Sequence, residues 1–152
     1  ALPSLLMQYM HPPTLRSLEQ LRVVAFGLVG IEQGKVTHRF VEHLGNDLHF
    51  HQDGAGNELN AVQHGSDNEI VGVSYGWNNS ADIEQDGRDN LATVRQEGSF
   101  NDVMLSQSGA EHLVKVTQNG FGNDAIASQA GYGNAAYINQ SGWNNTALVT
   151  QQ

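Results

Sequence analysis

The sequence predicts an all-β protein, a β-solenoid of about five 22-residue coils whose strands form two parallel stacked sheets. Three observations support this prediction: a pattern that recurs every eleven residues, an alternation of apolar and polar residues within each repeat, and a second period of twenty-two residues. A repeat this short cannot bury an apolar face by itself, so neighbouring repeats must stack to form a core.

The eleven-residue pattern runs through residues 46–151 as ten rows. Asparagine opens every row except the one that begins with His112: Asn46, Asn57, Asn68, Asn79, Asn90, Asn101, Asn123, Asn134 and Asn145. Glutamine occupies the seventh position of every row except the one with Ser74: Gln52, Gln63, Gln85, Gln96, Gln107, Gln118, Gln129, Gln140 and Gln151. Glycine follows two residues later: Gly54, Gly65, Gly76, Gly87, Gly98, Gly109, Gly120, Gly131 and Gly142.

Each row is predicted to be a seven-residue strand followed by a four-residue arc. Positions three and five are mostly apolar, as Leu48 and Phe50 are in the first row, whereas positions two, four and six are mixed. Such an alternation is typical of a strand with one buried face. The glycine after the glutamine provides the backbone freedom that a tight reversal needs.

The arcs indicate that two rows make one coil. Acidic residues recur at 22-residue spacing in one kind of arc, and aromatic residues lie on a 22-residue grid in the other: Asp67, Asp89 and Glu111; Trp77, Phe121 and Trp143. Ten rows therefore give five coils, which would stand about 24 Å tall at roughly 4.8 Å per coil. Within the first coil we expect Phe50 to face Ala61, because small residues opposite large ones suit a thin interior.

The asparagine and glutamine columns lie on the face that the alternation predicts to be buried. We expect each amide to donate to the carbonyl oxygen of its copy one coil away, which forms hydrogen-bonded ladders. Each bond contributes about 1 kcal/mol, and a buried amide without a partner costs more than that. The ladders therefore penalise any slip in register.

Residues 1–45 do not follow the repeat, so we divide the chain into this amino-terminal segment and a solenoid of residues 46–152. The segment is either a packed cap or extra strand, or a flexible leader. Its apolar run, residues 23–31, is too short to span a bilayer.

The repeat resembles that of the curlins, the subunits of bacterial curli fibres. Residues 52–63, 96–107 and 118–129 each read Gln-x-Gly-x2-Asn-x5-Gln, as the second part of the curlin motif does. The curlin motif opens with serine, where this chain mostly has asparagine. The resemblance covers residues 46–151, about two-thirds of the chain.

The resemblance implies an extracellular functional amyloid that builds biofilm matrix and supports adhesion. It also implies three partners: further copies of the chain, a nucleator curlin, and an outer-membrane export pore to which residues 1–45 would address the chain. The acidic balance favours the major fibre subunit. The alternatives are a nucleator that templates a partner curlin at the cell surface, and a capped ligand-binding solenoid.

Composition narrows the function classes further. The chain has 152 residues, no cysteine and a net charge of −9, and no basic patch suggests a nucleic-acid partner. The lack of cysteine suits a chain that crosses an oxidising periplasm unfolded. No catalytic constellation interrupts the repeat, so we expect neither an enzyme nor a cofactor.

The acidic arcs are weak candidates for a metal site, because oxygen ligands suit calcium or magnesium. We favour a second interpretation, in which Asp67, Asp89 and Glu111 slow premature assembly by charge repulsion. His49 and His51 share one strand face, but two ligands do not make a zinc site. For the aromatic arcs, packing against neighbouring coils is favoured over a role in adhesion.

The last row is predicted to be a docking edge. Its inward residues are Asn145, Ala147, Val149 and Gln151. An unpaired strand edge at the end of a solenoid is a template for another chain. We expect it to receive the first coil of the next subunit, so that copies stack head to tail into a cross-β fibre.

Overall fold

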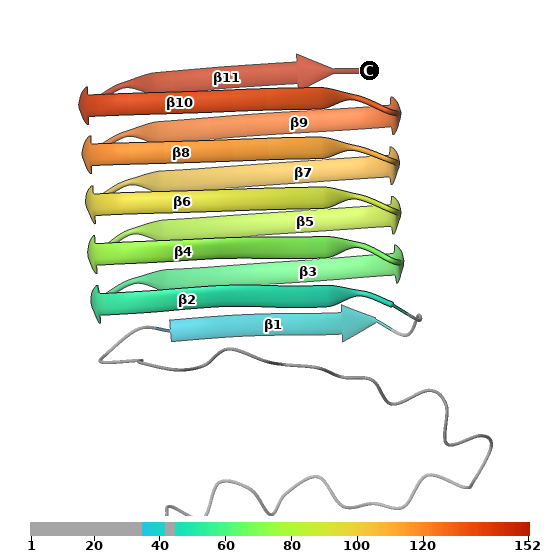
Figure 1. Cartoon of the computed structure of the whole chain (residues 1–152), viewed down its shortest axis with the longest axis horizontal. Helices are drawn as coiled ribbons and strands as arrows, with labels where there is room; N and C mark the ends of the chain where they lie inside the picture. Colours follow the sequence, from blue (N-terminus) through green and yellow to red (C-terminus); the bar gives the residue numbers. More distant parts are fainter. Residues whose placement is uncertain (1–34, 42–44) are drawn as a thin grey trace, which may run out of the picture.

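The structure is a computed structural model that describes residues 35–41 and 45–152. It is an all-β solenoid, which confirms the predicted fold class (Figure 1). The strands are β1 Lys35–Val41, β2 Asp47–Ala55, β3 Glu58–Ser66, β4 Glu69–Trp77, β5 Ser80–Arg88, β6 Leu91–Ser99, β7 Asp102–Ala110, β8 Leu113–Phe121, β9 Asp124–Tyr132, β10 Ala135–Trp143 and β11 Thr146–Gln151. Within these described ranges, no helix is long and apolar enough to cross a membrane.

The strands alternate between two parallel sheets as the chain winds upward. One sheet holds β1, β3, β5, β7, β9 and β11, and the other holds β2, β4, β6, β8 and β10. Figure 1 shows the two sheets as interleaved layers, with β1 at one end and β11 at the other. From β2 onward each residue pairs with the residue twenty-two positions later, as Leu48 does with Ile70. Two rows therefore make one coil, as the arcs predicted.

Strand β1 lies before the predicted start of the solenoid. It pairs with β3 in a register of twenty-three residues, so that Val36 lies beside Leu59. In this register His38 lies beside Ala61 and Phe40 beside Gln63, so β1 departs from the repeat even after the one-residue shift. Residues 35–41 thus form the extra strand that was one of the two alternatives. The apolar run 23–31 lies outside the described residues, and the division of the chain at residue 45 stays a prediction.

The core consists of the apolar columns at positions three and five. Its buried members are Phe50, Leu59, Ala61, Ile70, Ala81, Ile83, Ala92, Val94, Val103, Leu105, Val114, Val116, Ala125, Ala127, Ala136 and Ile138. Gly72 belongs to these columns for a steric reason. A Cβ atom at Gly72 would lie 2.3 Å from Cε2 of Phe50, its partner on the neighbouring strand. The missing side chain makes room for the phenyl ring.

The reversals differ from the predicted arcs. Strands β2 to β10 have nine residues each and continue through the glycine column, so the prediction of seven-residue strands with four-residue arcs is wrong. The chain turns at the last position of each row, where non-glycine residues adopt φ values of 53–59°. These are Asp67, Asn78, Asp89, Phe100, Glu111 and Asn144. Asparagine and aspartate tolerate this left-handed conformation better than most residues, which gives Asp67 and Asp89 a backbone role.

Candidate functional site

The asparagine column forms a hydrogen-bonded ladder along the solenoid. In the even-numbered sheet, Nδ2 of Asn90 donates to Oδ1 of Asn68 over 2.9 Å, and Nδ2 of Asn68 donates to Oδ1 of Asn46 over 3.1 Å. The backbone N–H of each later asparagine donates to the same oxygen, as from Asn90 to Asn68 over 3.2 Å. Five Oδ1 atoms accept two bonds from the next coil in this way, those of Asn46, Asn68, Asn79, Asn101 and Asn123.

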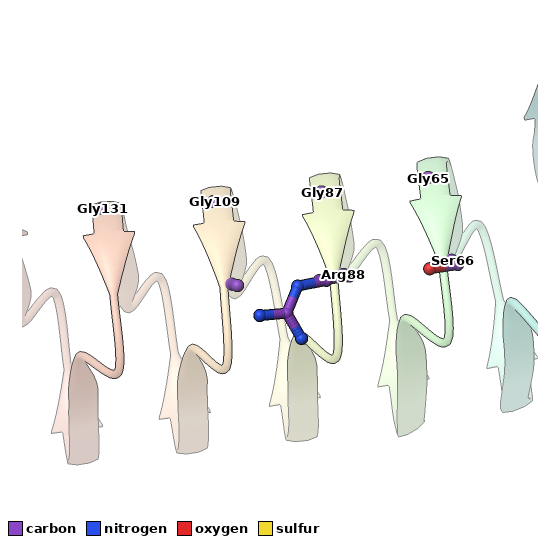
Figure 2. Close-up of a pocket in the computed structure, with 7 residues that line it drawn as sticks. Gly65, Ser66, Gly87, Arg88, Gly109 and Gly131 are labelled. Carbon is purple, nitrogen blue, oxygen red and sulfur yellow. The ribbon is translucent and has the colours of Figure 1, made fainter.

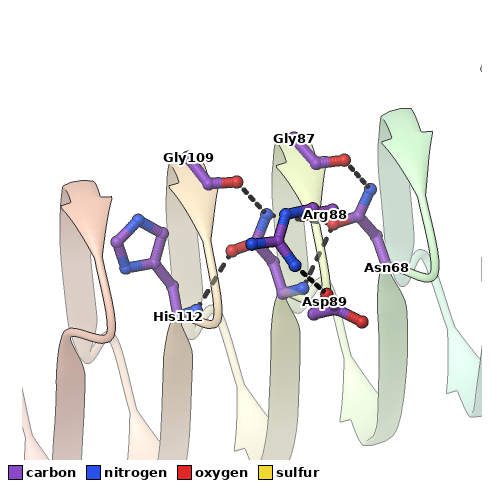
Figure 3. Close-up of polar contacts among 7 residues, drawn as sticks. Asn68, Gly87, Arg88, Asp89, Gly109 and His112 are labelled. Carbon is purple, nitrogen blue, oxygen red and sulfur yellow. Dashed lines mark hydrogen bonds and ion pairs between the residues drawn. The ribbon is translucent and has the colours of Figure 1, made fainter.

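The same amides also hold the glycine column in place. Nδ2 of Asn68 donates to the carbonyl oxygen of Gly87 over 3.1 Å (Figure 3). On the other edge, Nδ2 of Asn79 donates to the carbonyl oxygen of Gly98 over 3.1 Å. Each of these bonds spans nineteen residues, from an asparagine to the arc of the next coil. One asparagine thus contacts both the coil before and the coil after it. This linkage explains why the asparagine and glycine columns occur together.

The glutamine column connects the two sheets across the interior. Gln85 of β5 is fully buried, and its Nε2 donates to Oε1 of Gln107 over 2.9 Å. The same nitrogen lies 3.0 Å from the carbonyl oxygens of Glu69 and Asn90. Glu69 belongs to β4 in the opposite sheet. A glutamine therefore stabilises its own ladder and the junction between the sheets.

The two ladders run in opposite directions. Asparagine Nδ2 atoms donate toward the amino-terminal end, as from Asn145 to Asn123 over 2.9 Å. Glutamine Nε2 atoms donate toward the carboxy-terminal end, as from Gln118 to Gln140 over 3.0 Å. The two ends of the solenoid therefore present different chemical groups, and one end is complementary to the other.

The ladders are incomplete at the amino-terminal end. Gln52 is buried, yet among the described residues neither its Nε2 nor its Oε1 has a hydrogen-bond partner. Within the same ranges, Oε1 of buried Gln63 also lacks a partner. Buried amide atoms without partners cost about 1–3 kcal/mol each. Nε2 of Gln52 faces the next coil, where Ser74 replaces a glutamine, and Gln63 already lies beside β1. Oε1 of Gln52 is therefore the atom to which another copy could donate a missing hydrogen bond.

The predicted docking edge lies at the opposite end, on β11 and the residue before it. Asn145, Ala147, Val149 and Gln151 are each partly buried, whereas the same columns are buried in the coils below. Gln151 Oε1 accepts from Gln129 over 2.7 Å, and its Nε2 reaches only the carbonyl of Ala135, at 3.1 Å. The geometry leaves this edge open, and its role in docking stays a prediction.

The acidic arcs do not assemble a metal centre. Asp67, Asp89 and Glu111 are exposed on three successive coils, and Asp89 pairs with Arg88 over 2.9 Å. In the described part of the chain, no group of three or more histidine, aspartate or glutamate side chains could hold a metal ion. His49 contacts Asp47 over 2.9 Å, and the ring of His51 packs edge-on against Tyr75.

The aromatic arcs form a partly exposed cluster that includes one residue the pattern did not identify. Phe121 and Trp143 have ring centroids 6.5 Å apart, and Phe100 packs 5.2 Å from Phe121. Trp77 is 62% exposed and Trp143 is 78% exposed. Phe100 lies one residue outside the aromatic column, at a left-handed turn, so the 22-residue spacing could not reveal it.

A shallow groove crosses the other edge of the solenoid, over the carboxy-terminal ends of β3, β5, β7 and β9. Gly65, Gly87, Gly109 and Gly131 line it with Ser66 and Ala110, and Arg88 projects from it (Figure 2). The glycines lie one per coil because a Cβ atom at Gly65, Gly87 or Gly109 would lie 1.8–2.0 Å from the carbonyl oxygen of the next glycine in the column. The groove is therefore a consequence of the glycine column, and its lining contains no nucleophile paired with a base.

Strands β3, β5, β7 and β9 carry six outward carboxylates: Glu58, Asp82, Glu84, Asp86, Asp102 and Asp124. Desolvation raises the pKa of Asp102 above its ordinary value of 3.8, and the Asp124 carboxylate one coil away raises it further. A raised folded-state pKa means that the ionised form costs stability, and that this cost disappears as the pH falls through the raised pKa.

We therefore expect Asp102→Asn to stabilise the fold at neutral pH. The gain is a few tenths of a kcal/mol, because water screens this exposed position. Urea unfolding at pH 7 and pH 3.5 checks it: the variant should be more stable at pH 7 and equal to the original chain at pH 3.5. Glu84→Gln, on the same face, controls for the general loss of negative charge. An unchanged difference at both pH values would contradict this explanation.

Comparison with known protein families gives a match over most of the solenoid. Three segments, residues 54–87, 87–120 and 121–152, match the curlin associated repeat. A comparison with curated proteins finds no match. The matched segments contain the ladder columns from Gly54 onward and the predicted docking edge.

Proposed function

Because this chain belongs to the curlin-repeat family, we propose that it is a structural subunit of an extracellular curli-type fibre in which copies stack head to tail. One observation carries the head-to-tail arrangement: amide ladders run along the solenoid, with breaks at Ser74 and His112, and are unfinished at both ends. The family match supports a fibre subunit, and the ladder ends support the way in which copies join.

The joint follows from the order of the strands. Strand β10 ends one sheet and β2 begins it, so β10 of one copy would pair with β2 of the next. Strand β11 would then lie beside β1 in the other sheet. In this arrangement Nε2 of Gln140 donates to the partnerless Oε1 of Gln52 in the next copy, as glutamines do within one chain. Such a contact does not close on itself, so it generates a filament.

We also propose a biological role for the fibre and a place for this chain in it. The fibre would contribute to biofilm matrix and adhesion, and this chain would be its major subunit. Its partners would be a nucleator curlin and an outer-membrane export pore that recognises residues 1–45. The outward carboxylates would keep the soluble chain from associating too early, because net charge of one sign opposes association.

The test compares Gln151→Ala with Gln96→Ala. Gln96 is fully buried and donates within the solenoid, over 2.7 Å to the Ser80 carbonyl and over 3.1 Å to the Asn101 carbonyl. Its loss should lower the free energy of unfolding by about 2 kcal/mol. Gln151→Ala should change that free energy by less than about 1 kcal/mol, because Gln151 is only partly buried and its side chain makes two hydrogen bonds, against four for Gln96.

The elongation rate of preformed seeds distinguishes an effect of each substitution on docking from its effect on folding. If the last coil is the docking edge, Gln151→Ala slows elongation more than its small loss of stability accounts for. Gln96→Ala slows elongation only in proportion to its lost stability. The same relation between stability and elongation in both variants would show that the ladder matters for folding alone. Monomers that fold but never form filaments would instead favour a capped ligand-binding solenoid.

A further inference from the structure

His112 takes the place of asparagine in the ladder of the even-numbered sheet, directly before β8. Its side chain is only 1% exposed, and it lies between Asn90 of the previous coil and Asn134 of the next. We propose that His112 makes the last coil sensitive to pH, because this position works only with a neutral imidazole. The proposal rests on the proposed function only for its effect on fibre growth.

The hydrogen bonds of the ring fix where its proton lies. Nε2 is 3.2 Å from the carbonyl oxygen of Ser108, which can only accept, so Nε2 carries the hydrogen. Nδ1 is 3.2 Å from the backbone nitrogen of Asn134, whose N–H donates to it. Nδ1 must therefore be unprotonated. Both ring nitrogens have assigned roles, and the imidazole in this state is uncharged.

Histidine also weakens the ladder at this point. An asparagine here would donate to Oδ1 of Asn90 and to the carbonyl of Gly131, as the other asparagines of the column do. His112 donates to Asn90 only through its backbone N–H, over 3.1 Å. Figure 3 shows the ladder running from Asn68 toward the histidine, with the ring beside the arc of Gly109. The bond from the Asn134 N–H to Nδ1 of His112 is thus a main side-chain contact between this coil and the start of β10.

A second proton on the ring removes that link. Protonated Nδ1 becomes a donor facing the Asn134 N–H, and a positive charge is placed in a buried position. Lowering the pH supplies this second proton, so a comparison of two pH values tests the inference. The effect has one sign: the junction is strongest when the imidazole is neutral and weakens as the pH falls.

The charged groups on the stacked arcs do not form ion pairs with the ring. Arg88 and Asp89 of the previous coil pair with each other, and Glu111 bonds to the hydroxyl of Tyr132 in the next coil. Asp86 and Lys115 are exposed on their strands. Among the described residues, no carboxylate hydrogen-bonds to the imidazole of His112. Protonation therefore gains no direct ion pair to offset its cost.

The weakened link lies next to the surface where copies would join. Asn134 directly precedes β10, which ends the even-numbered sheet. Loosening β10 would disturb the strand on which β2 of the next copy stacks. Under the proposed function, mild acid would therefore slow elongation and destabilise the carboxy-terminal end of the fibre.

Hydrogen exchange on the folded full chain tests the inference, with His112→Asn as the matched variant. The two proteins are compared at pH 7.5 and again at pH 5.0, because the intrinsic exchange rate itself depends on pH. At pH 5.0 we expect the amides of Asn134 and β10 to exchange about tenfold faster in the original chain than in His112→Asn. At pH 7.5 the ratio should be close to one. His64→Asn, near the carboxy-terminal end of β3 at the same edge, should behave like the original chain.

Two results would overturn the inference. One is equal exchange of β10 in the original chain and in His112→Asn at pH 5.0. The other needs no variant: a nitrogen-15 spectrum of the His112 ring showing a hydrogen on Nδ1 at pH 7.5. Fibre formation at pH 7.5 is scored separately. An absence of fibres would refute the proposed function, whereas the exchange result would still decide the role of His112.

Discussion

Replacing Gly65 with alanine should unfold the junction between β3 and β5. A Cβ atom at Gly65 would lie 1.8 Å from the carbonyl oxygen of Gly87, which is backbone and cannot move aside. The two coils would have to separate, and the bonds that the asparagine column makes to this arc would break. We expect the free energy of unfolding to fall by more than about 4 kcal/mol, measured by urea unfolding of the soluble chain.

Gly131→Ala is the matched control for this prediction. Gly131 occupies the same column on the same edge and has nearly the same backbone, with φ +97 against +98 for Gly65. Its Cβ atom would come no closer than 3.8 Å to another residue. The control therefore carries only the conformational cost of alanine at this φ, about 1–3 kcal/mol. Equal losses in the two variants would show that backbone conformation, not the contact between coils, requires the glycine.

Gly142→Ala should produce a chain that folds but stops fibre growth. A Cβ atom at Gly142 would meet only Nδ2 of Asn145, at 3.7 Å, because no further coil lies above it. At the earlier members of the glycine column, from Gly54 to Gly120 at eleven-residue spacing, the same atom would lie 1.8–2.0 Å from the carbonyl oxygen of the glycine one coil later. A second copy stacked on β10 would create this clash. We therefore expect elongation to fall at least tenfold, which corresponds to about 1.4 kcal/mol of docking free energy.

Mixing Gly142→Ala with wild-type seeds shows which end of the fibre the substitution blocks. The amino-terminal end of Gly142→Ala is unchanged, so the variant should add to the carboxy-terminal end of wild-type seeds and then block it. Small amounts of the variant should inhibit growth of the wild-type chain. Gly133→Ala, at the same end of the solenoid but outside the glycine column, is the control, because nothing lies within 4 Å of its Cβ position. Normal growth in the presence of Gly142→Ala would contradict stacking on β10.

The repeat columns were predictable because each is enforced by contacts between identical positions. Gln85 is buried and bonded to Gln107, its copy one coil later, and spacing alone is enough to predict that contact. The two-row coil was predictable for a similar reason. The arcs on the two edges have different neighbours, and their compositions differ accordingly.

Other features depend on contacts that spacing does not encode. From the sequence alone, Gly72 is an unexplained glycine in an apolar column. The structure explains it, because the ring of Phe50 occupies the space that a side chain would need. Phe100 joins the aromatic cluster from a neighbouring position, which the 22-residue grid excludes. The length of the strands was misjudged because the glycine column was taken for the turn. These glycines instead lie in the strands, where the asparagine amides need access to their carbonyl oxygens.

The hydrogen-bonding role of His112 could not be predicted from its position in the asparagine column. The sequence identifies it as the single break in the asparagine column, but only the positions of Ser108 and Asn134 reveal which ring nitrogen accepts. The open amide atoms of Gln52 likewise appear only once the neighbouring strands are placed.

The most direct test of the central claim is the structure of the assembled fibre by electron cryomicroscopy. Head-to-tail stacking predicts strands perpendicular to the axis at a spacing of about 4.8 Å, uninterrupted across the joint between copies. Strand β10 should pair in parallel with β2 of the next copy, with Gly142 beside Gly54. Fibres in which intact solenoids lie side by side, with the free edge of β10 exposed, would contradict the account.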